Sequence, residues 1–310
     1  FYSKDFFPYS LLINKPNYVC ASTGFWGNLC KKLNYDPKWK KIKMPYLMVQ
    51  TVTGEGCSIG EEKFFNSTAR KHKFGTDKLP YPLAPVTFSM GGGTTEGSGI
   101  FVLLYKSLQE KRLRSVIKKE TLGLRPHGFA EVEVLDEKGN YCDIGEPGRL
   151  VAISPCEMKR YTTGNAKSPY ITDATGKTWL NMGTYSYKSD KNGKIKMKGR
   201  MSDIIYLESG EKIPYYKLVD AVSKDTKNIL SCTVVRAKDT DEYICHFEMQ
   251  PDSKKKKEET IESCARRIEK VVPEEVLNKM YIRYHSFDES FPIDPSGKRS
   301  ITTLINTGVD

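Results

Sequence analysis

Two short stretches of the sequence combine residue types that could act on a phosphate. "GGGTTEG" (residues 91–97) offers backbone N–H groups and threonine hydroxyls to phosphate oxygens, and the carboxylate of Glu96 could ligate a metal ion. "DPSGKRS" (residues 294–300) places Lys298 on a loop fixed by proline and glycine, where its ammonium could reach a carboxylate or a phosphate. Each stretch by itself also fits a plain turn, because neither matches the common glycine-rich phosphate-loop patterns.

Buried strands and helices alternate around the first stretch. Glu61 follows Ser58 by three residues, which is the capping-box pattern at the start of a helix, and Gly75 is a stop signal for that helix. Another helix is predicted to open near residue 23. The apolar, β-branched runs predicted as strands are residues 18–21, 45–56 and 84–90. This alternation predicts a parallel sheet whose faces are covered by helices.

The pattern changes twice further along the chain. From about Phe129 the residues alternate with period two between Gly-containing turns, which predicts antiparallel β structure. Beyond Asp203 a short helix near residues 215–224, paired strands, a longer helix and a final strand predict a small α+β domain. We therefore predict an α/β and α+β fold in three parts, which are residues 1–128, 129–202 and 203–310.

Composition narrows the class of protein. The 310 residues carry a net charge of +11, yet the lysines are spread along the chain without interleaved aromatic residues, so nucleic-acid binding rests on charge alone and we set it aside. The eight cysteines form no C-x-x-C pair, which is typical of reduced thiols in a reducing compartment and predicts a cytoplasmic protein. No apolar run reaches the ~18–20 residues that cross a membrane.

Taken together, the motifs resemble those of the adenylate-forming superfamily in their order and spacing. "GGTTE" is similar to the family's "YGxTE", and "VEVLDEKGNYCDIGEPGRL" to its "VRIVDEETGEPLPPGEPGEL". "WLNMGTYSYKSDKNGKIKMKGRMSD" is similar to "WLHTGDLGYIDEDGFIYIVGRKKD", and "FPIDPSGKRSITTL" to "LPRNPSGKILRREL". The family's Ser/Thr/Gly-rich phosphate loop is not in this sequence. We therefore expect this chain to be the C-terminal part of such a fold, and to be inactive by itself.

The resemblance implies an AMP-forming acyl-CoA synthetase or adenylation domain. In this family a carboxylate attacks the α-phosphate of ATP to give an acyl-adenylate and pyrophosphate, and a thiol then displaces AMP. The implied cofactors are ATP, Mg²⁺ and CoA, with carrier-protein pantetheine as the alternative thiol. The implied substrate is a carboxylic acid, for which a fatty acid is one candidate, and a homodimer is an open alternative for the assembly.

The resemblance also assigns roles to single residues. Lys298 bridges the carboxylate and the α-phosphate, Thr95 binds the α-phosphate, and Glu96 ligates Mg²⁺. Arg200 binds ribose hydroxyls or phosphate, and Asp203 is the hinge of the small domain. The cofactor-binding candidates are Gly54, Glu55, Gly56, Gly92, Gly93, Thr94, Thr184 and Arg200.

Three positions depart from the family pattern. Gly92 replaces the aromatic residue that stacks on adenine, Thr184 replaces the aspartate that holds the ribose, and Lys217 replaces a glutamate. The first two losses each weaken nucleoside binding, on the order of 10²-fold in affinity. They favour the alternative of a non-catalytic binding or regulatory module with the same fold, whereas the retained Glu96 and Lys298 favour an enzyme.

Overall fold

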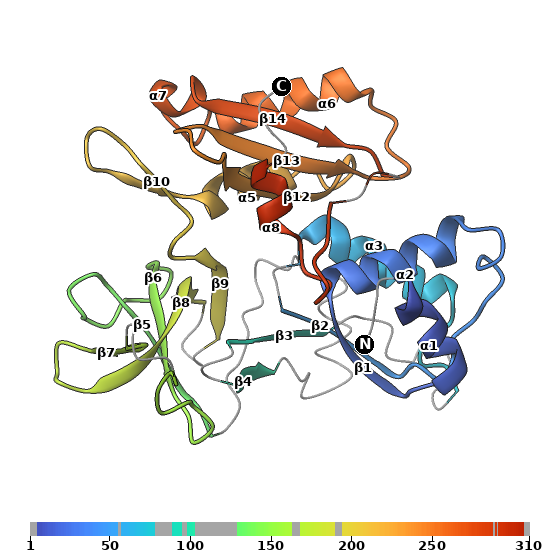
Figure 1. Cartoon of the computed structure of the whole chain (residues 1–310), viewed down its shortest axis with the longest axis horizontal. Coiled ribbons are helices and arrows are strands. Elements are labelled where there is room, and N and C mark those ends of the chain that lie inside the picture. Colours follow the sequence, from blue (N-terminus) through green and yellow to red (C-terminus); the bar gives the residue numbers. More distant parts are fainter. Residues whose placement is uncertain are drawn as a thin grey trace. The chain divides into compact units, whose positions relative to one another are not determined.

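The computed structural model describes residues 5–54, 57–77, 89–94, 98–102, 129–162, 168–189, 194–287, 289 and 291–306. The chain divides into two compact units. One unit joins Phe1–Phe88 to Asp203–Asp310, and the other is Ser89–Ser202 (Figure 1). The three-part division expected from the sequence stays a prediction.

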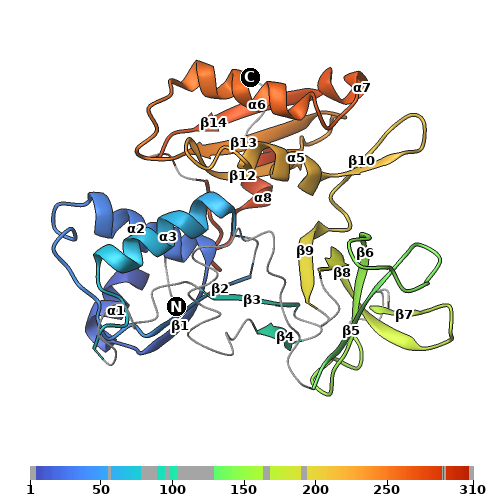
Figure 2. The same ribbon diagram turned by 180° about the vertical axis from the view of Figure 1, so that it is seen from behind.

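The first unit begins with a layer of helices on a parallel strand pair. Trp26 and Phe65 are fully or almost fully buried, and the Trp26 indole Nε1 donates to Thr51 O at 3.0 Å, which fixes helix on strand. Trp26 is therefore a core residue in this structure. Two of the helices, α2 and α3, lie side by side (Figures 1 and 2). The elements of this layer are α1 (Phe6–Asn14), β1 (Tyr18–Ser22), α2 (Thr23–Tyr35), β2 (Val49–Thr53) and α3 (Ile59–Lys71).

The two ends of α3 test the helix signals directly. At its start Ser58 Oγ accepts from Glu61 N at 3.1 Å and Glu61 Oε2 accepts from Ser58 N at 2.7 Å, so the predicted capping box is confirmed. At its end, the prediction that the helix stops at Gly75 is wrong. Lys73 adopts the left-handed conformation (φ 57°), and Phe74 N donates to Ala69 O at 2.9 Å. This Schellman closure ends the helix at Lys71, before the glycine is reached.

The C-terminal part of the first unit is a small α+β domain. β13 pairs antiparallel with β12 and parallel with β14, and helices cover both faces of this sheet (Figure 2). On one face Leu218 of α5 and Ile268 of α6 pack against Phe247, and on the other Leu304 of α8 packs with Ile244. The elements are β10 (Ile204–Tyr206), β11 (Lys212–Pro214), α5 (Tyr215–Ser223), β12 (Ile229–Arg236), β13 (Tyr243–Met249), α6 (Lys257–Ile268), α7 (Glu274–Leu277), β14 (Met280–His285) and α8 (Ile301–Asn306).

The second unit is built from antiparallel strands, as the period-two pattern predicts. Its main sheet has the order β5-β6-β8-β7, with β9 paired to β8, and buries Leu150, Leu180 and Ile195. β3 and β4 pair with each other antiparallel, outside this main sheet. The strands are β3 (Ser89–Thr94), β4 (Ser98–Val102), β5 (Glu131–Leu135), β6 (Gly148–Ile153), β7 (Tyr170–Thr172), β8 (Thr178–Lys188) and β9 (Ile195–Arg200). The predicted α/β and α+β fold class is confirmed.

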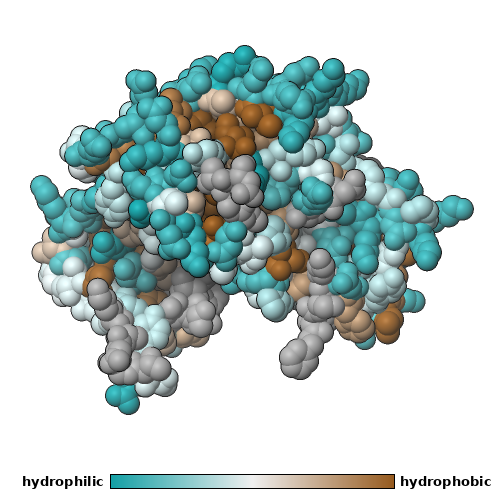
Figure 3. Space-filling model, turned by 45° about the horizontal axis from the view of Figure 1, so that its top comes forward, coloured by the Kyte–Doolittle hydropathy of each residue, from teal (hydrophilic) through white to brown (hydrophobic). Residues whose placement is uncertain are grey.

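Hydrophilic residues cover most of the face shown in Figure 3, and the apolar residues form a few small groups. Within the described residues, the helices are all too short or too polar to cross a membrane.

Candidate functional site

Lys298 lies in a tight turn that Asp294 organises. Asp294 Oδ1 accepts from Ser296 N at 2.8 Å, from Ser296 Oγ at 2.6 Å and from Lys298 N at 3.1 Å. Burial by itself would raise the pKa of Asp294, but these hydrogen bonds outweigh it and hold that pKa below its usual value. The carboxylate is therefore ionised near neutral pH, and the turn has a fixed shape.

This turn docks on the start of helix α2 through two glycines. Gly24 N donates to Gly297 O at 3.1 Å, and Ser22 Oγ donates to Ser296 O at 3.2 Å. A Cβ atom at Gly24 would lie 2.4 Å from Gly297 O, and one at Gly297, where φ is 78°, would lie 2.3 Å from Ser22 Oγ. The two backbones can approach this closely only because neither residue carries a side chain.

The docked turn brings two predicted site residues together. The Lys298 side chain lies against Gly54, because a Cβ atom built on that glycine would be 3.0 Å from Lys298 Cε. Gly54 has φ 88°, a left-handed conformation that suits glycine, and it directly follows β2. The half-buried side chain of Lys298 therefore lies over the glycine turn that the resemblance assigns to cofactor binding.

A buried ion pair lies on the other side of the same turn. Arg299 Nη2 donates to Glu61 Oε1 and to Ser231 Oγ, both at 2.7 Å, and the two charged side chains are only 14% and 9% exposed. The guanidinium also lies 5.5 Å from the centre of the Phe291 ring. Sequence reasoning missed this pair. The capping box pointed to Glu61 but explained only one of its carboxylate oxygens.

A second ion pair, Lys31–Glu248, joins α2 to β13. Lys31 Nζ also donates to Phe287 O at 3.0 Å and lies 4.4 Å from the centre of that ring. Burial raises the pKa of Glu248 in spite of the neighbouring ammonium. The structure thus holds a carboxylate inside the protein through a cation from a distant part of the sequence.

Thr184 and Arg200 lie opposite each other in the second unit. They are register partners on β8 and β9, so their side chains are neighbours on one face of the sheet. Thr184 Oγ1 donates to Met182 O at 3.1 Å, and Arg200 is exposed. The structure brings together the two candidates for ribose binding, but the threonine hydroxyl is already used within its own strand.

The other candidates divide between described and undescribed residues. The unit boundary falls immediately before Asp203, whose carbonyl accepts from Tyr215 N at 2.9 Å. The backbone of Gly92 pairs with Phe101, and that of Thr94 with Ser98. Gly93 lies between them in β3. The predicted site residues that lie outside the described residues are Glu55, Gly56, Thr95 and Glu96.

The predicted Mg²⁺ site at Glu96 stays a prediction. No group of three or more metal-binding side chains occurs in the part of the chain that the structure describes, and Glu96, the expected Mg²⁺ ligand, is not in that part.

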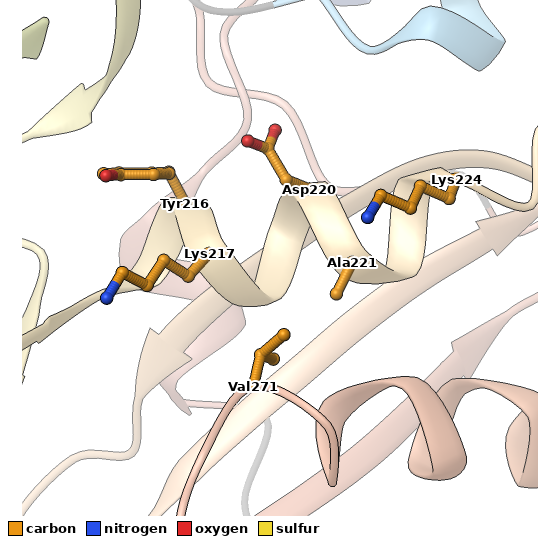
Figure 4. Close-up of a pocket in the computed structure, with 6 residues that line it drawn as sticks. All are labelled: Tyr216, Lys217, Asp220, Ala221, Lys224 and Val271. Carbon is orange, nitrogen blue, oxygen red and sulfur yellow. The ribbon is translucent and has the colours of Figure 1, made fainter. Parts of the chain in front are cut away.

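Lys217, the third departure from the family pattern, lines a shallow, open depression of about 380 Å³ beside α5 (Figure 4). Ala221 and Val271 face each other there, whereas Asp220 points away. The depression contains neither Lys298 nor Gly54, so it is separate from the docked turn.

No protein-family model and no curated protein matches this sequence. Solved structures do match. The amide bond synthetase McbA from Marinactinospora thermotolerans aligns at 15% identity with a TM-score of 0.65, over 98% of this chain and 54% of that one. The chain shares the fold of this synthetase.

Two further structures agree with this assignment. The anthranilate CoA ligase AuaEII, in complex with anthranoyl-AMP, aligns at 14% identity with a TM-score of 0.66, over 97% of this chain and 51% of that one. The o-succinylbenzoate CoA synthetase from Bacillus subtilis, in complex with an acyl-adenylate intermediate, aligns at 18% identity with a TM-score of 0.61. The alignment covers 99% of this chain and 54% of that one. The chain thus spans about half the length of these proteins, and its resemblance to the family is confirmed at the level of the fold.

Proposed function

We propose that this chain is part of an ATP-dependent, AMP-forming ligase that activates a carboxylic acid and transfers the acyl group to a thiol. The observation that carries the proposal is the position of Lys298 on a rigid turn beside Gly54. A cation held at the glycine turn suits a reaction that joins two anions, a carboxylate and a triphosphate. The activity is proposed for the full-length protein.

The reaction has two steps. A carboxylate oxygen attacks the α-phosphorus of ATP, the bond to the bridging oxygen of pyrophosphate breaks, and an acyl-adenylate forms. A thiolate then attacks the acyl carbonyl carbon, and AMP leaves with the electron pair of its acyl–oxygen bond. Both steps place negative charge on oxygen atoms, so we expect positioning and electrostatic stabilisation to supply most of the catalysis.

The proposed roles follow the sequence assignments. Lys298 neutralises the approaching carboxylate and the α-phosphate, Thr95 donates to that phosphate, and Arg200 binds the ribose or a phosphate. Mg²⁺ held by the carboxylate of Glu96 would neutralise the pyrophosphate that leaves. Asp203 is the proposed hinge through which the small domain changes position between the steps.

The acid and the acceptor are left open within this class. Two of the similar structures are CoA ligases of aromatic acids, anthranilate and o-succinylbenzoate, and a fatty acid is the other candidate that we carry. CoA and a carrier-protein pantetheine are both candidate thiols. Cytoplasmic localisation, a homodimer and the lack of nucleic-acid binding also stay predictions.

Pyrophosphate release tests the proposal. The full-length protein should release pyrophosphate with ATP–Mg²⁺ and at least one acid from a panel of aromatic and aliphatic carboxylic acids. Lys298→Ala should abolish this step but retain thioester formation from supplied acyl-adenylate. Lys279→Ala is the matched control, because Lys279 pairs with exposed Asp241 at 2.6 Å, away from the turn. A full-length protein with no ATP-dependent signal for any acid would contradict the proposal.

A second candidate function is a non-catalytic binding module. Thr184 favours it, since a hydroxyl that bonds its own strand replaces the carboxylate that holds ribose in the family. Calorimetry with ATP–Mg²⁺ and with acyl-CoA separates the two, because tight binding of ATP would exclude the second candidate.

A further inference from the structure

Arg299 directly follows Lys298 and fixes the same turn from the opposite side. Its guanidinium spans two distant segments by donating both to Glu61 on α3 and to Ser231 on β12. The backbone of Arg299 also bridges to Ile293, which closes the base of the turn. The direction in which Lys298 leaves this turn therefore depends on where Arg299 is held.

Glu61 connects this anchor to the glycine turn beside Lys298. One carboxylate oxygen accepts from Arg299, and the other accepts from the backbone N–H of Ser58 in the capping box. Ser58 Oγ in turn donates to Leu230 O at 2.6 Å. Since Ser58 lies only four residues after Gly54, the segment that faces Lys298 and the loop that carries it share one carboxylate.

The two buried ion pairs also influence each other. The charges of Glu61 and Arg299, as well as that of Lys31, shift the pKa of Glu248, so the pairs Lys31–Glu248 and Arg299–Glu61 lie within electrostatic reach of each other. Removing one member leaves the others desolvated with their charges no longer balanced.

We infer that Arg299 and Glu61 are positioning residues that hold Lys298 at the glycine turn during adenylation. The inference rests on the proposed function and extends it from Lys298 to the pair that sets its place. The pair does not contact the reacting atoms. It acts by favouring the docked arrangement of the turn over others.

The backbone amide of Gly24 reports this docking independently of activity. It lies in the first turn of α2, where a helix supplies no acceptor of its own, and its partner is Gly297 O. Hydrogen exchange at Gly24 therefore measures how often the Lys298 turn leaves the helix.

The experiment compares Arg299→Met, Glu61→Gln and the double variant in the full-length protein. We expect Arg299→Met to slow pyrophosphate formation about 10²-fold and to leave thioester formation from supplied acyl-adenylate within about twofold. Exchange at Gly24 should become faster. The effects of the single variants should not add in the double variant, because both remove one interaction. The control is Arg236→Met, since Arg236 and its partner Asp241 are 59% and 57% exposed.

Each result decides the inference. A parallel loss of both half-reactions together with a lower melting temperature would assign the pair a purely structural role, and unchanged adenylation would remove any role. A wild-type protein without ATP-dependent activity would contradict the proposed function alone. In that case, faster exchange at Gly24 in Arg299→Met would still support the anchoring of the turn, and unchanged exchange would overturn it.

Discussion

Gly24→Ala should release the Lys298 turn from helix α2 without unfolding the protein. The added methyl group would lie 2.4 Å from Gly297 O and 2.8 Å from the Ile293 methyl Cγ2. The first of these atoms belongs to the backbone and cannot move aside by rotating a side chain. The turn as a whole must therefore retreat from the helix.

The size of the effect follows from the contacts that the retreat breaks. The hydrogen bonds Gly24 N–Gly297 O and Ser22 Oγ–Ser296 O are lost, and each contributes about 1 kcal/mol net. A loss of about 2 kcal/mol lowers the docked fraction relative to the undocked one about 30-fold. Alanine is also a better helix former than glycine, by up to about 1 kcal/mol, which offsets part of this loss, so the free energy of global unfolding should fall by only about 1 kcal/mol.

Adenylation rate and urea denaturation measure these two quantities separately. We expect pyrophosphate formation to fall about 30-fold in Gly24→Ala, while the urea midpoint stays near that of the wild type. Gly27→Ala is the matched control in the same helix, because beyond its chain neighbours and the nearby helix backbone no atom lies within 4 Å of its added Cβ. It should keep full activity and be slightly more stable. Equal activities for the two variants would refute the claim that this contact positions Lys298.

Two further predictions concern pH and the nucleotide. Burial and the charge of His285 lower the pKa of His246 to about 4, below its ordinary 6.5, so the unfolded chain takes up a proton at a higher pH than the native protein does. The free energy of unfolding should therefore be highest above pH 6.5 and fall by up to about 3 kcal/mol as the pH drops through 4. Urea titrations of His246→Gln should show a weaker dependence on pH than those of the wild type. Identical pH profiles for both proteins would contradict this prediction. Thr184→Asp should restore a carboxylate beside Arg200 and tighten ATP binding about 10²-fold by calorimetry, unless the protein has no nucleoside site.

Local patterns in the sequence predicted the elements that depend on neighbouring residues. The capping box of Ser58 and Glu61 is confirmed, because its hydrogen bonds join residues three positions apart. The antiparallel strands of the second unit are confirmed because the period-two alternation belongs to each strand by itself, although the ladders join residues as distant as Gly148 and Ser186. The stop of α3 was predicted at the wrong residue, since Lys73 takes the left-handed conformation two residues before Gly75. The motif order also identified the fold, although no single motif was specific enough to do so.

The tertiary structure alone decided how the candidate site is held. The sequence marked Lys298 and Gly54 as separate candidates, but their contact depends on two backbones approaching at Gly24 and Gly297. The sequence did not indicate that Arg299 would be buried with Glu61. A charged residue is predicted to be exposed unless a partner from a distant segment is known to lie beside it. Local hydrogen bonding is encoded within a few residues, whereas a buried charge is stabilised only by the complete fold.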